Sequence, residues 1–235
     1  MKKSISVFVP AYNEEKNIRA AIQSIIKAVT FLTTDYEILV LDDCSTDRTA
    51  DIVKAEIRKY KHIRLIHNAQ NQGIGKSFKK AIALANKNYI TVFPGDNDMS
   101  SKSLIDLFKK IEAADLVMSY PIDQKHRSIK RRILSFCFIK LMNIIFKLNV
   151  RYYNGPFITK LSLIKNTFNL KSKRFLIYAE LKLRLIRMGY SYLEIPFEHT
   201  GRAHGMSKAV SIYNLLDTLS TIAFLMSDNT LNKKR

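Results

Sequence analysis

The stretch YITVFPGDNDMSS, residues 89–101, sets both the fold and the chemistry of this chain. Its first residues are mostly apolar and include β-branched and aromatic side chains, which is typical of a buried strand. The strand ends at a proline and a glycine, and Asp96 and Asp98 follow with only Asn97 between them. Two carboxylates this close repel each other unless a positive charge lies between them. The stretch therefore predicts a strand that ends here and a cation that both acids share.

Strands and helices are predicted to alternate up to residue 120. The predicted strands cover residues 5–10, 36–43, 63–67, 89–93 and 115–120. Helical spacing of apolar residues fills the intervals, at residues 15–30, 48–60, 74–85 and 102–113. This alternation indicates βαβ units and a mostly parallel sheet, and the nearly continuous apolar strands indicate helices on both faces. We therefore expect an α/β protein with a Rossmann-like sheet.

The pattern changes beyond residue 120. We predict helices over 129–148, 173–188 and 210–226, a turn at 152–157, a short strand at 190–197, and Gly189 as a helix C-cap. The expected organisation is one domain over residues 1–210, followed by an amphipathic helix and a basic tail at 211–235.

The composition is strongly basic, with 39 Lys and Arg against 20 Asp and Glu, a net charge of +19. This charge indicates a polyanionic partner: nucleic acid, an anionic membrane or a phosphorylated substrate. The alternative is that the positive charge only keeps the protein soluble. No nucleic-acid-binding signature is present, and acidic loops would repel a phosphate backbone, so nucleic acid is not expected. Cys44 and Cys137 form no CxxC pair and fit a reducing compartment. The sequence is compatible with a homo-oligomer.

A membrane surface is the favoured polyanionic partner. No stretch reaches the roughly 18 to 20 apolar residues that span a bilayer. We therefore expect a soluble or peripheral protein, cytoplasmic and bound at the inner face of the membrane. Basic residues precede the apolar segment 129–148, and this order is typical of an interfacial helix. The alternative is that the segment is a buried core helix.

Polar loops follow each of the first four predicted strands. They are PAYNEE (10–15), DDCSTD (42–47), NQGIGKS (71–77) and PGDND (94–98). In a parallel sheet all four lie at the carboxyl edge, where ligands bind. Asp96 and Asp98 suit a hard cation, Mg²⁺ or Mn²⁺, and substrate phosphates typically complete the coordination shell of such a cation. In the second loop, one acid is expected to face the site and to accept hydrogen bonds from a base or a ribose, while Thr46 or Asp47 caps the next helix.

The third loop is similar to a P-loop but fails its pattern. A Walker motif ending at residues 75–77 requires glycine at position 70, which is Gln70, and a dinucleotide fingerprint from Gly73 fails at Phe78. Gly73 still permits close approach of a ligand to the backbone, and Lys76 supplies positive charge.

Together, VPAYNEE, DDCSTDRT, NQGIGKS and PGDND resemble the family 2 glycosyltransferases of GT-A fold over residues 4–120. The later pieces YNGPF, YAELKLRLIRMGY and EIPFEHTGRAHGMSK resemble the polyprenyl-phosphate branch, which is similar to dolichol-phosphate mannose synthase, and extend the likeness to about residue 210. The resemblance implies inverting transfer of a sugar from a nucleotide-sugar donor to a polyprenyl phosphate. The alternative is transfer to a glycan hydroxyl, as in capsule or O-antigen synthesis.

The resemblance also implies roles for individual residues. The donor would be bound by Pro10, Ala11, Tyr12, Glu14, Asp43, Gly73, Lys76, Asp96 and Asn97. Asp96 and Asp98 would hold the metal, with Asp98 the more direct ligand. Arg202 and Lys208 would lie in a loop that closes over the donor and acceptor phosphates.

Two departures from the family pattern matter. Ser100 stands where the branch often has a metal-binding Gln, and Tyr120 stands where it often has an Arg. The cations for the acceptor phosphate are therefore expected to be Arg127, Arg131 and Arg132, together with Lys208. A hydroxyl acceptor would need a general base. Glu180 is the candidate, ahead of Asp98, and the alternative for Glu180 is an acid on a solvent-exposed helix face.

Overall fold

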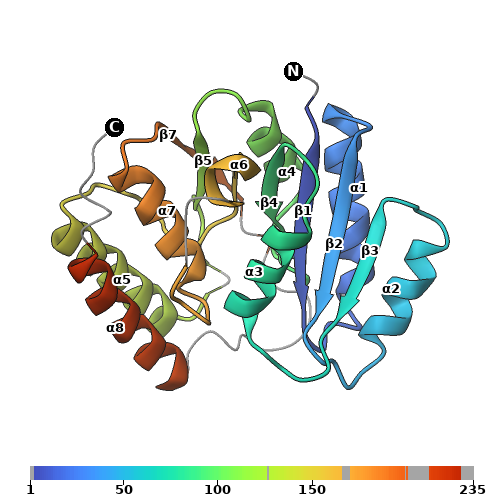
Figure 1. Cartoon of the computed structure of the whole chain (residues 1–235), viewed down its shortest axis with the longest axis horizontal. Coiled ribbons are helices and arrows are strands. Elements are labelled where there is room, and N and C mark those ends of the chain that lie inside the picture. The colour runs from blue at the N-terminus through green and yellow to red at the C-terminus, as the bar shows by residue number, and fades with distance from the viewer. Residues whose placement is uncertain (1–2, 126, 166–169, 199, 201–211, 229–235) are drawn as a thin grey trace.

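The computed structural model describes residues 3–125, 127–165, 170–198, 200 and 212–228. Its centre is a seven-stranded sheet with helices on both faces, in the order β3-β2-β1-β4-β6-β5-β7 (Figure 1). This arrangement confirms the predicted α/β class and the mostly parallel sheet.

All strands but one point the same way. They are β1 (Ile5–Ala11), β2 (Tyr36–Asp42), β3 (Ile63–His67), β4 (Tyr89–Val92), β5 (Leu116–Pro121), β6 (Phe157–Lys160) and β7 (Tyr192–Phe197). Neighbouring strands are parallel except where β6 runs antiparallel between β4 and β5. The strands β1, β2 and β4 therefore end at one edge, the lower edge in Figure 1.

Helices cover the sheet in two layers. They are α1 (Ile18–Leu32), α2 (Thr49–Ile57), α3 (Ile74–Leu84), α4 (Ser101–Lys109), α5 (Ile129–Phe146), α6 (Leu161–Lys165), α7 (Ile177–Arg187) and α8 (Ile212–Ser227). The helices α1, α2 and α4 share one core cluster with the sheet, and α3, α5, α6, α7 and α8 share the other. Met188 is the C-cap residue of α7, and the predicted glycine, Gly189, ends the helix one position later with a φ of 86°.

Alternation along the strands explains why both faces are covered. Leu39 and Leu41 of β2 lie in one core cluster, whereas Ile38 and Val40 lie in the other. Successive side chains of a strand point to opposite faces, so an unbroken apolar run supplies two cores at once.

The sequence prediction missed strand β6. Residues 152–157 were expected to form a turn, and no strand was expected after it, because β6 is only four residues long and ends in Lys160. Its partners are β4 and β5, which are distant in the sequence. Because β6 runs antiparallel, the turn that precedes it lies at the edge where β4 ends.

A buried lysine holds that turn. Lys182 of α7 is fully buried, and its Nζ donates hydrogen bonds to the carbonyl oxygens of Tyr153 (2.8 Å) and Gly155 (2.6 Å). The Nζ also lies 5.3 Å from the ring centroid of Phe157. Burial lowers the pKa of Lys182 to about 7, although the charge of Glu194 opposes this effect. The ammonium group thus replaces its hydration shell with backbone carbonyls.

Helix α5 is mostly exposed, so the alternative of a buried core helix is wrong. Only Met142 and Phe146 are buried. Large apolar side chains with exposed fractions of 45% to 75% lie on the rest of the helix, at Ile129, Ile133, Leu134, Phe136, Leu141 and Ile144. Among the described residues, no helix combines the length and apolar content needed to cross a bilayer.

Replacing Lys182 by Met should reveal the cost of burying this charge. Between pH 7 and the ordinary lysine pKa of about 10.4, the unfolded chain binds a proton at Lys182 that the folded chain releases. The free energy of unfolding of the wild type, relative to Lys182→Met, should therefore rise with pH by as much as about 1.4 kcal/mol per unit. Below about pH 7 the difference should be constant, because both states are then protonated.

Urea denaturation of both proteins at about pH 6.5, 8 and 9.5 measures this difference. Lys54→Met is the matched control, because the side chain of Lys54 is 62% exposed. A stability difference between the wild type and Lys182→Met that does not change with pH would contradict the prediction.

Candidate active site

Hydrogen bonds tie the loops at the carboxyl edge to one another. The N–H of Asp43 donates to the carbonyl of Ala11 (2.8 Å), and the N–H of Gly95 donates to the carbonyl of Pro10 (3.3 Å). The N–H of Asn13 also donates to the hydroxyl of Ser45 (2.9 Å). The loops after β1, β2 and β4 therefore form one connected surface.

Each of the four polar loops contains a residue in the left-handed region. The φ angles are 56° at Asn13, 66° at Cys44, 83° at Gly73 and 54° at Asn97. Positive φ is uncommon for residues other than glycine, and such residues gather at functional sites. Asparagine tolerates this conformation, so Asn13 and Asn97 were a signal in the sequence that the prediction did not use.

The acidic triplet 96–98 is fixed by its backbone. The N–H of Asn97 donates to the carbonyl of Pro94 (3.2 Å), and the N–H of Thr200 donates to the carbonyl of Asp98 (3.1 Å). A Cβ atom at Gly95 would lie 2.7 Å from the carbonyl oxygen of Pro10, so only glycine allows this close approach to β1. These contacts hold the triplet at the end of β4.

The donor groups of the triplet fit a divalent cation. Asp96 and Asp98 supply carboxylate oxygens, and the buried side-chain oxygen of Asn97 has no hydrogen-bond partner among the described residues. No group of three or more His, Cys, Asp or Glu side chains able to hold a metal is present in the described part of the chain. Asp96 and Asp98 would supply two carboxylates to Mg²⁺ or Mn²⁺, and phosphate oxygens and water typically complete the shell of such a cation.

Ser100, at the position of the family's Gln, has a structural role. It is the N-cap residue of α4, and its hydroxyl accepts a hydrogen bond from the N–H of Ser103 (3.1 Å). The helix therefore begins at Ser101, and two residues separate it from the acidic triplet.

Asp42, the last residue of β2, and Asp43, which follows it, are both buried but have different partners. Asp42 contacts Nδ1 of His67 (2.8 Å) and accepts a hydrogen bond from the N–H of Ser45 (3.0 Å). Asp43 accepts hydrogen bonds from the third loop, namely from the side chain of Asn68 (2.9 Å) and the N–H groups of Gln72 (2.9 Å) and Gly73 (2.8 Å). Asp43 thus shapes the third loop, and its contact with a base or ribose stays a prediction.

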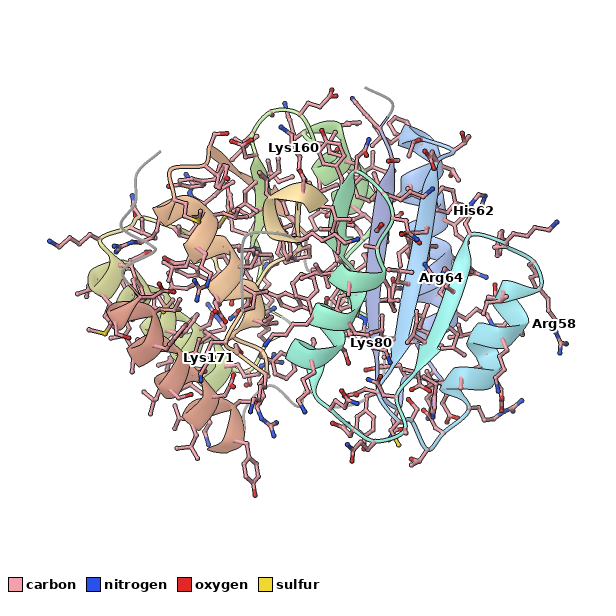
Figure 2. The ribbon with its side chains drawn as sticks, in the orientation of Figure 1. Arg58, His62, Arg64, Lys80, Lys160 and Lys171 are labelled. Carbon is pink, nitrogen blue, oxygen red and sulfur yellow. The ribbon has the colours of Figure 1, made fainter. Side chains whose placement is uncertain are left out.

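Asn68 links this network to α3. Its side-chain oxygen accepts a hydrogen bond from Nζ of Lys80 (2.9 Å), a residue that is labelled on α3 in Figure 2. Asn68 was absent from the predicted site, although it directly follows the last residue of β3.

Asp47 joins the first loop to the start of α2. Its carboxylate accepts hydrogen bonds from the N–H groups of Glu15 (3.0 Å) and Thr49 (2.9 Å). Burial opposes ionisation of Asp47, but the hydrogen bonds from the side chain of Thr49 and from these backbone groups outweigh it and lower the pKa.

The remaining predicted donor residues lie at the same edge. Tyr12 is half-buried, and Glu14 accepts a hydrogen bond from Nδ2 of Asn17 (2.8 Å). Lys76 is exposed in the first turn of α3. The structure therefore brings all four polar loops together, as the sequence predicts.

Glu180 is not an exposed helix-face acid, and that alternative is wrong. It is fully buried, and its two oxygens accept hydrogen bonds from the N–H groups of Lys171 and Ser172 (2.8 Å each). Nε of Arg184 also donates to it (3.0 Å). These contacts support the backbone at residues 171–172, and they do not favour the general-base role, which stays a prediction.

The predicted acceptor-phosphate cations differ in how they are held. Nη1 of Arg127 donates a hydrogen bond to the hydroxyl of Tyr152 (2.7 Å), and its guanidinium lies 5.7 Å from that ring centroid. Arg131 is half-buried and Arg132 is exposed, both in the first turn of α5. Arg202 and Lys208 lie outside the described residues.

Arg151 is a further cation that the sequence prediction missed. Its guanidinium lies 4.7 Å from the ring centroid of Tyr120, the residue that replaces the family's Arg. The backbone N–H of Arg151 donates to Oε1 of Glu194 (2.8 Å). The chain thus supplies a guanidinium next to this position from a different segment.

The sequence is similar to those of known glycosyltransferases. Dolichyl-phosphate beta-glucosyltransferase of Dictyostelium discoideum is 32% identical over 152 residues, which cover 57% of this chain and 46% of that protein. Poly(ribitol-phosphate) beta-glucosyltransferase of Bacillus spizizenii is 32% identical over 117 residues, covering 48% of this chain and 18% of that protein. The matched region spans less than half the length of either relative.

Solved structures share the fold. Glucosyl-3-phosphoglycerate synthase from Mycobacterium tuberculosis, in complex with Mn²⁺, uridine diphosphate and phosphoglyceric acid, superposes with a TM-score of 0.65 at 21% identity, covering 94% of this chain and 78% of that one. TarS of S. aureus, residues 1–349, has a TM-score of 0.57 at 24% identity, covering 84% and 59%. The architecture is the GT-A glycosyltransferase fold. Residues 6–168 match glycosyl transferase family 2, and the chain therefore belongs to that family.

Proposed function

We propose that this chain is a metal-dependent glycosyltransferase that moves a sugar, with inversion, from a nucleotide-sugar donor to a polyprenyl phosphate at a membrane surface. The acidic triplet held at the end of β4 is the observation that carries the proposal. Membership of family 2 supports the reaction class, and the dolichyl-phosphate relative supports a lipid phosphate as the acceptor.

At the donor end, Asp96, Asn97 and Asp98 would hold Mg²⁺ or Mn²⁺. When bound, the cation neutralises negative charge that develops on the leaving diphosphate. Lys76, at the start of α3, adds a positive charge at the same edge, and the backbone N–H groups of the first turn of a helix favour anions. Tyr12 and Glu14 line the loop that would receive the nucleotide.

At the acceptor end, cations gather where a phosphate would bind. Arg127 follows β5 and contacts Tyr152, and Arg151 lies over Tyr120 at the end of β5. The reversed strand β6 brings the 151–156 segment to this edge. A phosphate acceptor is already anionic near neutral pH and needs no strong general base. This chemistry agrees with the hydrogen bonds that occupy both oxygens of Glu180.

Transfer to a glycan hydroxyl is the second candidate. The similarity to a poly(ribitol-phosphate) beta-glucosyltransferase favours it. This reaction would need a base within hydrogen-bond reach of the hydroxyl. The two candidates therefore differ in the acceptor and share the donor site.

The exposed faces of α5 and α8 support docking at a membrane. Helix α8 exposes Tyr213, Leu215, Leu216, Leu219 and Met226, in addition to the exposed apolar residues of α5. Lysines and arginines precede and begin α5. Apolar side chains beside basic residues are typical of an interfacial helix, and each basic residue near an anionic surface contributes about 1 kcal/mol.

Labelled nucleotide sugars, supplied with Mn²⁺ and either undecaprenyl phosphate or a glycan, test the proposed reaction. The wild type should form a lipid-linked product. Asp98→Asn should lower the rate at least about 100-fold, because the amide would hold the divalent cation more weakly and the leaving diphosphate would then lack the positive charge that neutralises it. Asp106→Asn, an equal loss of charge on the exposed surface of α4, should leave the rate unchanged.

Two different results would each contradict one part of the proposal. Product on the glycan alone would contradict the lipid acceptor. A rate for Asp98→Asn equal to that of the wild type would contradict the metal site.

Vesicle co-sedimentation tests membrane docking. The wild type should bind vesicles that contain an anionic phospholipid at low salt. The double variant Ile133→Ser and Phe136→Ser should bind at least about tenfold more weakly, because two apolar side chains no longer enter the interface. Phe31→Ser removes a similarly exposed aromatic residue from α1 and serves as the control. Binding that does not depend on anionic lipid, or an equal loss in the control, would contradict docking through α5.

A further inference from the structure

We infer that Glu180 and Asp217 are positioning residues for the donor site: together they clamp the segment 171–173 against the glycine loop 72–75. The inference rests on the proposed function for its donor, but the clamp itself is a property of the folded chain. Lys171, which is labelled in Figure 2, begins the segment beside the lower end of α7.

Two carboxylates from two helices bind consecutive backbone groups of this segment. Glu180 of α7 accepts the N–H groups of Lys171 and Ser172, each at 2.8 Å. Asp217 of α8 accepts the N–H of Lys173 (3.1 Å) and the hydroxyl of Ser172 (2.6 Å). The segment is neither helix nor strand, so these side chains supply the partners that its backbone N–H groups require.

The clamped segment lies directly against the third polar loop. The N–H of Gly75 donates to the carbonyl of Lys173 (3.1 Å). A Cβ atom at Gly75 would lie 2.4 Å from the carbonyl carbon of Lys173, and one at Gly73 would lie 3.1 Å from its oxygen. Gly75 is therefore needed for this approach, and the φ of 83° at Gly73 favours glycine there as well.

Asp43 also holds this loop, because its carboxylate accepts hydrogen bonds from the N–H groups of Gln72 and Gly73. The loop thus has two supports, one from Asp43, directly after β2, and one from the clamp. Only the second depends on α7 and α8, which come late in the sequence.

The negative charge of Glu180 in the clamp is balanced by a buried arginine. Glu180 is fully buried and pairs with Arg184, which is itself 4% exposed and donates to Asp228 at the end of α8 (2.8 Å). A buried carboxylate persists only with such partners. The same ion pairs therefore attach α8 to α7 and keep Asp217 beside the segment.

This arrangement makes donor affinity depend on α8. If loosening the clamp leaves the 72–75 loop in its binding conformation in about a tenth of the molecules, the apparent Kd for the donor rises about tenfold. The reacting groups at residues 96–98 are not part of the clamp, so turnover at saturating donor should hardly change. The inner face of α8 thus serves the donor site, while its outer face exposes Leu216 and Leu219.

The full chain carrying Asp217→Asn tests the inference, because the amide removes one acceptor from the clamp at nearly constant size. Hydrogen exchange of peptides covering residues 72–77, measured without donor, should become about tenfold faster, and exchange in β2 should not change. The KM for the nucleotide sugar should rise about tenfold, with kcat within about twofold of the wild type.

Ser172→Ala removes the hydroxyl partner of Asp217 without changing charge and should give the same pattern to a smaller extent. Asp51→Asn, the same substitution at an exposed acid of α2, is the matched control and should change neither quantity.

Wild-type exchange at residues 72–77 in both clamp variants would overturn the inference. So would a fall in kcat with an unchanged KM for the donor. If the wild type binds no nucleotide sugar, the proposed function fails, and the exchange measurement still decides whether the clamp orders the loop.

Discussion

The backbone groups at the ends of parallel strands must find partners beyond the sheet, and the rest of this structure depends on how they do so. Buried N–H and C=O groups are costly when unpaired. Here the loops satisfy one another: the carbonyl of Ala11 accepts from Asp43, that of Asp42 from Asn68, and that of Pro10 from Gly95. Four segments that are distant in the sequence are therefore hydrogen-bonded to one another at one edge of the sheet. These hydrogen bonds fix the position of the acidic triplet.

Much of the fold follows from local pattern. The mostly apolar runs at residues 5–10 and 36–43 match the observed strands to within one residue, because a strand buried on both faces needs a nearly continuous apolar run. Strand β6 does not follow from such a pattern. It is short, and its stability comes from pairing with β4 and β5, which no local property of residues 157–160 reveals.

The same division holds for the site. The position of Asp96 and Asp98 after an apolar strand was enough to place them at the carboxyl edge. The surroundings of Glu180 were not predictable, because its partners are the backbone of residues 171–172 and a guanidinium one helical turn away. Lys182 is a similar case: a lysine in an amphipathic helix is usually exposed, and here a turn of the chain closes over it.

The reversed strand also constrains the order in which the sheet assembles. The strands β3, β2, β1 and β4 pair with each other, whereas β5 and β7 reach them only through β6. During synthesis on the ribosome, β5 emerges before β6, the four-residue strand that connects it to β4. Until residue 160 has emerged, β4 has one unpaired edge and β5 has neither of its sheet partners, β6 and β7. The nascent chain therefore passes through a stage in which that edge of β4 and both edges of β5 are open to wrong pairing.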